Sequence, residues 1–224
     1  MPTLVGTPVN AVDYSGSLIS TLSAPAFKNT AGNLLVAQCR YSATGSSSPP
    51  TLSDTAGNTW LKAVGLDSAG DGNTGLSIFY AFQALANASN VVTAAFSPTQ
   101  KNCAITISEY SGADATAQVL DAIATGNGTV AGATATSGNF TTIDKNEVIC
   151  ACATWAGDST VTAGAGYTME KTDAKTGYED KKVSSGQIGV TATMTSSLST
   201  LKWLIVVATF RASVPKMGNL GCGA

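Results

Sequence analysis

The chain has 224 residues, 12% of them charged, and a formal net charge of −2. So few charges, with no basic stripe among them, exclude a protein that follows a nucleic-acid backbone through phosphate contacts. No window approaches the roughly 18 consecutive apolar residues of a membrane-spanning helix. Histidine is absent, which excludes Ser-His-Asp and Cys-His catalysis.

The N-terminal region predicts an opening strand over residues 3–12 and a second strand over residues 17–27. Its first residues have neither the basic segment nor the apolar segment of a secretory signal peptide. We therefore expect a protein that is assembled in the cytoplasm of its host cell, with an extracellular location as the alternative.

Two stretches, residues 31–112 and 143–213, show the same succession of strand patterns. Each opens with an apolar strand, passes through a Thr-rich loop and closes on a strongly apolar strand. Aligned in this way, Cys39 matches Cys152. Each stretch is shorter than the roughly 100 residues of a complete immunoglobulin-like sandwich. The repeat therefore predicts one fused domain over residues 1–213, followed by a C-terminal tail.

Alternation of apolar and polar residues predicts strands throughout, separated by Gly-, Ser- and Pro-rich turns. In residues 103–110 the alternation directs Cys103 and two isoleucines inward, and Thr106 and Ser108 outward. Residues 201–210 are apolar on both faces, which is typical of a central strand covered on both sides. The predicted fold class is all-β: a jelly-roll-like, two-sheet antiparallel β-sandwich with an internal pseudo-duplication.

Five cysteines are present, an odd number, and all but the last lie within apolar strands. This is not the pattern of a disulfide framework. It predicts reduced thiols that are buried as small hydrophobic side chains. No metal centre or other cofactor is expected, because no histidine is present to complete a zinc site. The five are Cys39, Cys103, Cys150, Cys152 and Cys222.

Without histidine, catalysis would depend on carboxylates, Lys or Tyr, and a pair of carboxylates can hydrolyse a glycoside. Glu109 is the only acid within an apolar strand of the first repeat. It is either a catalytic acid or a partner of backbone amides or Arg211 near the strand end. Asp121 and Glu147 stand at strand beginnings, where acids are commonly solvated. The chain is expected not to be an enzyme, and a carboxylate-based glycosidase is the third functional alternative.

The loop of residues 67–73 alternates oxygen-bearing side chains, as calcium-binding loops do. These side chains are Asp67, Asp71 and Asn73. An EF-hand loop would supply a bidentate Glu at its twelfth position, which is Ile78 in this chain. We interpret the loop as either a calcium site or a polar hairpin.

Four aromatic residues lie next to loops that also contain Asn, Asp and Thr, the company in which lectin sites stack an aromatic ring on a sugar. They are Trp60, Trp155, Tyr167 and Tyr178. The sequence leaves two interpretations open for Trp60 and Trp155, a glycan-binding surface or plugs at the ends of a sandwich.

The last residues, 214–224, contain Pro and Gly that disfavour both strand and helix. This tail is either disordered or an arm that lies on a neighbouring subunit. In the second case Met217 and Leu220 would be its apolar anchors.

Three strings, residues 52–60, 109–112 and 164–168, together resemble a recurrent β-sandwich module of bacterial surface proteins and phage virion proteins. The resemblance spans most of residues 31–213. Such modules are adhesive or structural units, and they have no settled catalytic residues. The resemblance therefore implies a non-enzymatic role.

These features predict a phage-type virion structural protein, either a head decoration (cement) protein or a fibre component, located in the virion. Its partners would be other copies of the chain, as in a trimer, and other virion proteins, with no nucleic acid and no membrane. The alternative is a lectin-like carbohydrate-binding module that contacts surface glycans.

Overall fold

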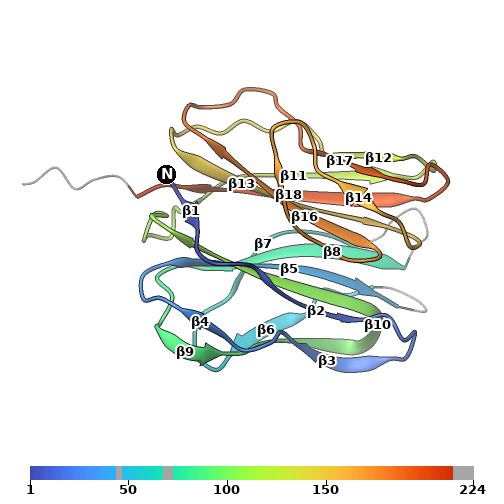
Figure 1. The fold of residues 1–224 in the computed structure, drawn as a ribbon, viewed down its shortest axis with the longest axis horizontal. Helices are drawn as coiled ribbons and strands as arrows, with labels where there is room; N and C mark the ends of the chain where they lie inside the picture. Colours follow the sequence, from blue (N-terminus) through green and yellow to red (C-terminus); the bar gives the residue numbers. More distant parts are fainter. Residues whose placement is uncertain (44–46, 68–72, 214–224) are drawn as a thin grey trace, which may run out of the picture.

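The computed structural model describes residues 1–43, 47–67 and 73–213. These residues form 18 strands, and every pairing between strands is antiparallel. The predicted all-β, antiparallel sandwich is therefore confirmed (Figure 1). Within the described part of the chain no helix is long and apolar enough to cross a membrane. Asp71 and the tail residues Met217 and Leu220 lie outside the described residues.

The first half of the chain builds two layers from one eight-stranded sheet, because the 20-residue strand β10 passes from one layer into the other. In the inner layer β1 and β2 flank β10, which is followed by β5, β8 and β7. In the outer layer β3 and β6 flank the first part of β10. The strands are β1 (Thr3–Leu4), β2 (Val9–Asp13), β3 (Ile19–Ser23), β5 (Leu34–Ser42), β6 (Thr51–Asp54), β7 (Leu61–Asp67), β8 (Thr74–Ala81) and β10 (Val92–Ser111).

A small two-stranded sheet, β4 (Phe27–Asn29) with β9 (Asn87–Asn90), closes one end of this half. The second half has a five-stranded inner sheet in the order β11-β18-β13-β16-β15 and a three-stranded outer sheet in the order β12-β17-β14. These strands are β11 (Leu120–Gly128), β12 (Thr134–Thr136), β13 (Glu147–Trp155), β14 (Val161–Thr162), β15 (Thr168–Thr172), β16 (Thr176–Val183), β17 (Thr193–Ser196) and β18 (Trp203–Arg211).

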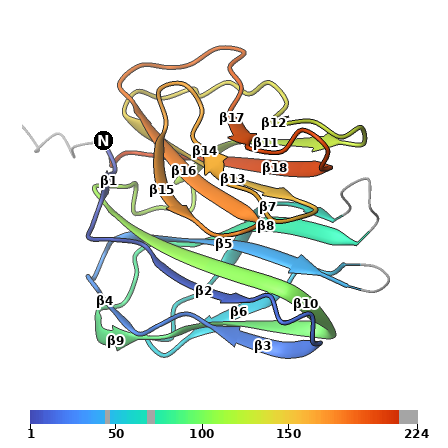
Figure 2. The same cartoon turned by 45° about the vertical axis from the view of Figure 1, so that its right-hand side comes forward.

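The inner sheets of the two halves have the same strand order, because β10-β5-β8-β7 corresponds to β18-β13-β16-β15. The edge strands even interrupt their pairing at the same place. The register shifts between Lys62 and Val64 in β7, and between Met169 and Lys171 in β15. Figure 2 shows the resulting stack of layers, with the two inner sheets facing each other at the centre. A jelly-roll connection pattern and an origin by duplication stay predictions.

The structure shifts the repeat by one residue relative to the sequence alignment. Leu34 and Val148 both face the central core, and they pair with Tyr110 and Phe210 respectively. With that register Cys39 faces the core of the first half, whereas Cys152 faces the central core. The predicted match of these two cysteines is therefore wrong, because successive strand residues point to opposite faces.

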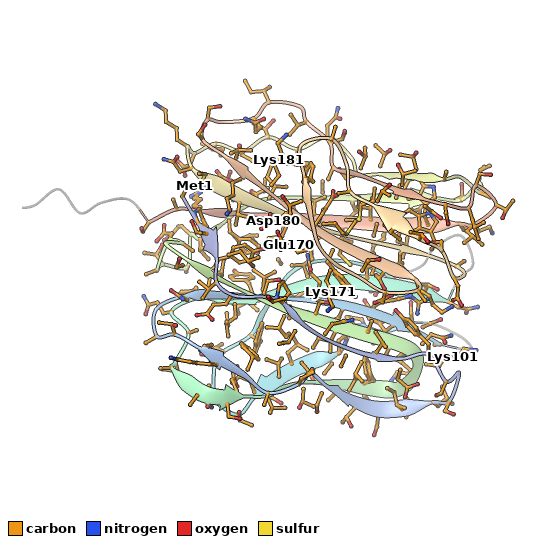
Figure 3. The ribbon with its side chains drawn as sticks, in the orientation of Figure 1. Met1, Lys101, Glu170, Lys171, Asp180 and Lys181 are labelled. Atoms are coloured by element: carbon orange, nitrogen blue, oxygen red, sulfur yellow. The ribbon has the colours of Figure 1, made fainter. Side chains whose placement is uncertain are left out.

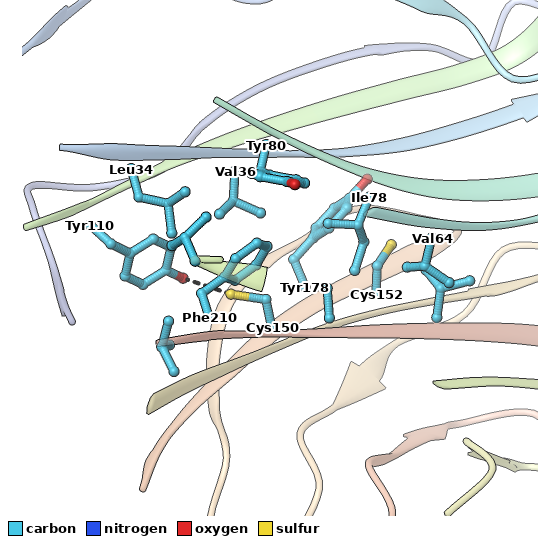
Figure 4. Packing of buried hydrophobic residues seen from close by; sticks show 14 of the residues in the cluster. Leu34, Val36, Val64, Ile78, Tyr80, Tyr110, Cys150, Cys152, Tyr178 and Phe210 are labelled. Atoms are coloured by element: carbon cyan, nitrogen blue, oxygen red, sulfur yellow. Dashed lines mark hydrogen bonds between the residues drawn. The ribbon is translucent and has the colours of Figure 1, made fainter. Parts of the chain in front are cut away.

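The central core lies between the two inner sheets and receives apolar side chains from both halves (Figure 4). Its buried members include Ile78 from β8, Cys150 from β13 and Phe210 from β18. Two further cores fill the space between the inner and outer layers of each half. Each inner sheet is consequently buried on both faces, and only the outer layers, edges and loops contact solvent.

This burial confirms one strand prediction and overturns part of another. β18 lies between β11 and β13 and contributes to two cores, as its two apolar faces predict. Cys103, Ile105 and Ile107 do point into a core. Thr106 and Ser108, however, are 0% and 5% exposed instead of facing solvent. The second half covers the face on which they lie.

Candidate functional site

Glu109, the acid expected either to catalyse or to hold backbone amides, does the latter. Its Oε1 accepts hydrogen bonds from the Thr30 N–H at 2.8 Å and from the Asn33 amide at 2.5 Å. The side chain is buried at the start of β5, where it orders the turn that enters this strand. Arg211 is not its partner and lies in the second half instead.

A second buried carboxylate occupies the matching end of the second half. Glu147, expected to be solvated, is 0% exposed at the start of β13 and accepts a hydrogen bond from the Asp144 N–H. Asp121 on β11 lies beside it, and its side chain is 0% exposed. Arg211 donates to Asp121 and forms an ion pair of 2.8 Å with Asp144. Two buried carboxyl groups, those of Glu147 and Asp121, therefore lie at the start of β13 next to the Arg211 guanidinium.

The two carboxyl groups of this cluster respond to their surroundings in opposite directions. Burial would raise the pKa of Asp121, but hydrogen bonds from the Ile143 N–H and Arg211 outweigh it and lower that pKa. Burial, followed by the adjacent Asp121 carboxylate, raises the pKa of Glu147 to about 7. The pair therefore carries close to one proton in mildly acidic solution, on Glu147, and loses it as the pH rises through about 7.

A second acidic pair, Glu170 and Asp180, lies near the border between the halves (Figure 3). The Tyr110 hydroxyl of the first half donates to Asp180 Oδ2 at 3.1 Å, and the Cys150 thiol lies 3.6 Å from the same hydroxyl (Figure 4). Burial raises the pKa of Asp180, and burial together with Asp180 raises that of Glu170. This arrangement connects the two inner sheets through a polar contact inside an otherwise apolar core.

The opposite end of the border carries a second polar connection. The Tyr14 hydroxyl, from the first half, donates to Asp173 at 2.6 Å and lies 3.0 Å from the Thr176 hydroxyl. Arg40 is 3% exposed and donates to the Thr154 hydroxyl at 2.9 Å. Both groups bridge the halves, so the polar residues of the border serve internal binding rather than an open cleft.

The four aromatic residues proposed to bind sugar do not come together. Trp155 and Tyr178 are 0% and 1% exposed and belong to different cores, so neither ring can stack on a glycan. Trp155 is therefore a buried packing residue, as its alternative interpretation predicts, and the burial of Tyr178 was not predicted. Tyr167 is half-buried at the end of the second half, with the Lys181 ammonium 5.4 Å from its ring centroid.

Trp60 is the remaining aromatic candidate. It is half-buried and packs against the cores of the first half, whereas its neighbours Thr59 and Leu61 line a surface hollow. Its indole N–H donates to Asp54 Oδ2 at 3.2 Å, and Asp54 also accepts from the backbone and amide of Asn58. The hollow measures about 420 Å³, within the usual range for small-ligand sites. Its lining combines polar Asn58, Thr59 and Gln83 with apolar Leu61, Phe82 and Leu85.

The predicted calcium loop is described only at its two ends. Asp67 accepts a hydrogen bond from the buried Tyr41 hydroxyl, and the Asn73 carbonyl accepts from the Ala43 N–H at 3.0 Å. Within residues 1–43, 47–67 and 73–213, no group of three acidic or cysteine side chains is placed to hold a metal ion. Tyr41 thus gives Asp67 a structural partner, and the choice between a calcium site and a polar hairpin stays a prediction.

The four described thiols are free and buried, as the sequence predicts. Burial raises the pKa of Cys103 to about 12, and it raises the pKa values of the other three still further. Thiols held in the neutral form are poor nucleophiles and poor metal ligands. These cysteines are therefore packing residues.

Large aliphatic side chains project from two loops that hydrogen-bond to each other in the second half. Ile143 is 75% exposed and Ile188 is 87% exposed. The Thr142 N–H donates to the Gln187 carbonyl at 2.9 Å, and the Gln187 N–H donates to the Thr142 hydroxyl at 2.8 Å. Both isoleucine side chains are thus exposed to solvent, although the backbone of their loops is hydrogen-bonded. Sequence patterning does not single them out, because each stands in a polar loop.

No protein-family model, curated protein or solved structure matches this chain. The geometry of its own residues must therefore carry any functional argument.

Proposed function

We propose that this chain is a non-enzymatic structural protein of the phage virion type, a head decoration or fibre component, that acts through contacts between subunits. The observation that carries the proposal is the exposure of Ile143 and Ile188 on mutually bonded loops. Burying such side chains against another subunit would recover about 1.5–3 kcal/mol each. A homo-oligomer, with a trimer as the working model, would supply that second surface.

The use made of the acidic residues supports the same proposal. Glu109 holds the turn before β5, and the Asp121–Glu147 pair lies beneath Arg211. Asp180 accepts a hydrogen bond from Tyr110 inside the border between the halves. The glycosidase alternative therefore loses its proposed acid, since Glu109 is committed to internal donors.

Light scattering of the full chain tests the proposal. We expect a particle mass that is a multiple of 22.5 kDa and that falls in the double variant I143S/I188S. The matched control is Val130→Ser, which replaces another highly exposed aliphatic residue, 79% exposed, and should leave the mass unchanged. A monomeric wild-type chain at micromolar concentration would refute assembly, and an unaffected double variant would remove these loops from the interface.

Glycan binding is the second candidate, and the hollow lined by Thr59 and Leu61, the chain neighbours of Trp60, favours it. The hollow offers apolar side chains together with amide and hydroxyl groups, the combination that sugar sites use. Titration with glycans should change the fluorescence of Trp60 in a variant that lacks Trp155 and Trp203. Flat responses across a glycan array, alongside an oligomer in light scattering, would leave only the structural role.

A further inference from the structure

The matching ends of the two halves bury a carboxylate in different surroundings. In the first half both partners of Glu109 are donors, the Thr30 N–H and the Asn33 amide. In the second half Glu147 Oε1 accepts from the Asp144 N–H, whereas buried Oε2 finds no donor in the protein. Its neighbour there is the Asp121 carboxyl group, which contributes only oxygen atoms. A proton on one of the two carboxyl groups would supply the missing donor.

Each element around Glu147 contributes to this balance of charge. On β18, Thr209 lies next to Glu147 and favours its charged form, and Arg211 divides its positive charge between Asp121 and Asp144. On β16, the residue opposite Glu147 is the apolar Val183. The surface hollow next to Arg211 adds one acid and one base, Asp114 and Lys145. One guanidinium thus lies among three carboxyl groups, and it pairs directly with Asp121 and Asp144.

We propose that the Asp121–Glu147 pair is a proton-operated lock, which holds β11 and β13 to the end of β18 while it is protonated and loosens this end when the proton leaves. The lock also reaches the surface loop that carries Ile143, because the Ile143 N–H donates to Asp121 Oδ2 at 2.7 Å. Loss of the proton places two anions side by side in a buried site. The loop of residues 141–146 should then open before the strands do, because it is the exposed part of the cluster.

The sign of the pH dependence follows from the direction of the shift. The pKa of Glu147 is raised from 4.5 to about 7, so the folded end of the sheet binds the proton more tightly than the opened one. The stability supplied by the lock is complete below pH 4.5 and is lost as the pH rises through about 7. Within that window the open fraction should rise by up to roughly tenfold per pH unit.

Nuclear magnetic resonance of the wild-type protein tests the lock directly. The side-chain carboxyl carbon of Glu147 should titrate near pH 7, and the amide protection factors of residues 141–146 should fall as it does so. Titration of Glu147 below pH 5 would overturn the proposal without the need for any variant.

Two variants separate the lock from other titrating groups. In Glu147→Gln, the protection of residues 141–146 should become independent of pH between 5 and 8. Glu179 is the matched control, because it is buried in the same half and burial also raises its pKa to about 7. Glu179→Gln should therefore keep the wild-type pH response in residues 141–146. Equal pH responses in wild type and Glu147→Gln would refute the lock.

The consequence for assembly rests on the proposed function. If Ile143 forms part of a subunit interface, the mass in light scattering should fall as the lock opens, and it should not fall in Glu147→Gln. A normal lock in the resonance titration with no effect of pH on mass would refute the role of Ile143 in assembly and leave the lock intact.

Discussion

The two halves should unfold as one unit because they share a core, and Phe210 is the side chain that tests this most directly. Phe210 lies on β18 of the second half and is fully buried in the central core. Its ring centroid lies 5.5 Å from that of Tyr80 on β8 of the first half, at an interplanar angle of 57° (Figure 4). Phe210→Ala removes this contact without touching either outer core.

The expected loss is large compared with the stability of the whole protein. Truncation of a buried Phe to Ala costs about 3–5 kcal/mol, which includes the cavity that remains. The tilted pair with Tyr80 contributes about 0.5–1.5 kcal/mol in similar cases, so we expect a value in the upper part of that range. Domains of this kind have about 5–15 kcal/mol in total. The variant should fold and should unfold at a urea concentration lower by about 1–2 M.

The three tryptophans make it possible to observe each half separately. Trp60 lies in the first half, and Trp155 and Trp203 lie in the second. We would measure urea unfolding by fluorescence in two backgrounds, one with only Trp60 and one without it. Phe210→Ala should shift the midpoint equally in both backgrounds. Val130→Ala, at a position that is 79% exposed, is the control. It should change the free energy of unfolding by no more than about 0.5 kcal/mol in either background.

A shift confined to the background that reports the second half would refute this reasoning. It would mean that the first half remains folded after the central core has opened on one side. The inner sheet of the first half would then be stable with one face in water, despite the apolar side chains that it contributes to the central core.

Three further changes test individual contacts. Gly126→Ala places a methyl group 2.0 Å from the Thr136 carbonyl oxygen, and forcing β11 from β12 should cost about 1–3 kcal/mol in urea unfolding. Tyr14→Phe leaves Asp173 without the donor that crosses between the halves, so it should lower the free energy of unfolding by about 1–3 kcal/mol, measured by thermal denaturation. An unchanged melting temperature would show that water replaces the hydroxyl. Asp54→Asn should weaken the loop of residues 55–60 and reduce the loss of stability in acid, since the pKa of Asp54 is lowered and its stabilisation disappears as the pH falls through that value.

Strand patterning predicts much of this fold because alternation is a local property. The apolar run over residues 201–210 predicts a strand covered on both sides, and β18 is that strand. The four cysteines within apolar strands predict buried thiols, and all four are buried. Each inference needs only the residue types and the period of two along one strand.

The candidate site could not be predicted in the same way, because it depends on which elements meet. Asp121 and Glu147 belong to strands on opposite sides of β18, and their position at strand beginnings suggested solvated acids. The third acid of the cluster, Asp144, lies in a loop. No local pattern indicates that these groups converge on Arg211. Glu109, by contrast, stands in an apolar strand next to a turn, and that context correctly favoured a bond to backbone amides.

By itself the sequence determined the strands, the buried thiols and the absence of histidine chemistry, because these follow from residue types and their spacing. Only the tertiary structure decided which faces of the strands are buried. Thr106 and Ser108 are buried because a second inner sheet covers them, and Trp155 is buried because an outer sheet covers β13. The same packing brings two carboxyl groups into one buried site beside Arg211, where desolvation and mutual repulsion raise the pKa of Glu147.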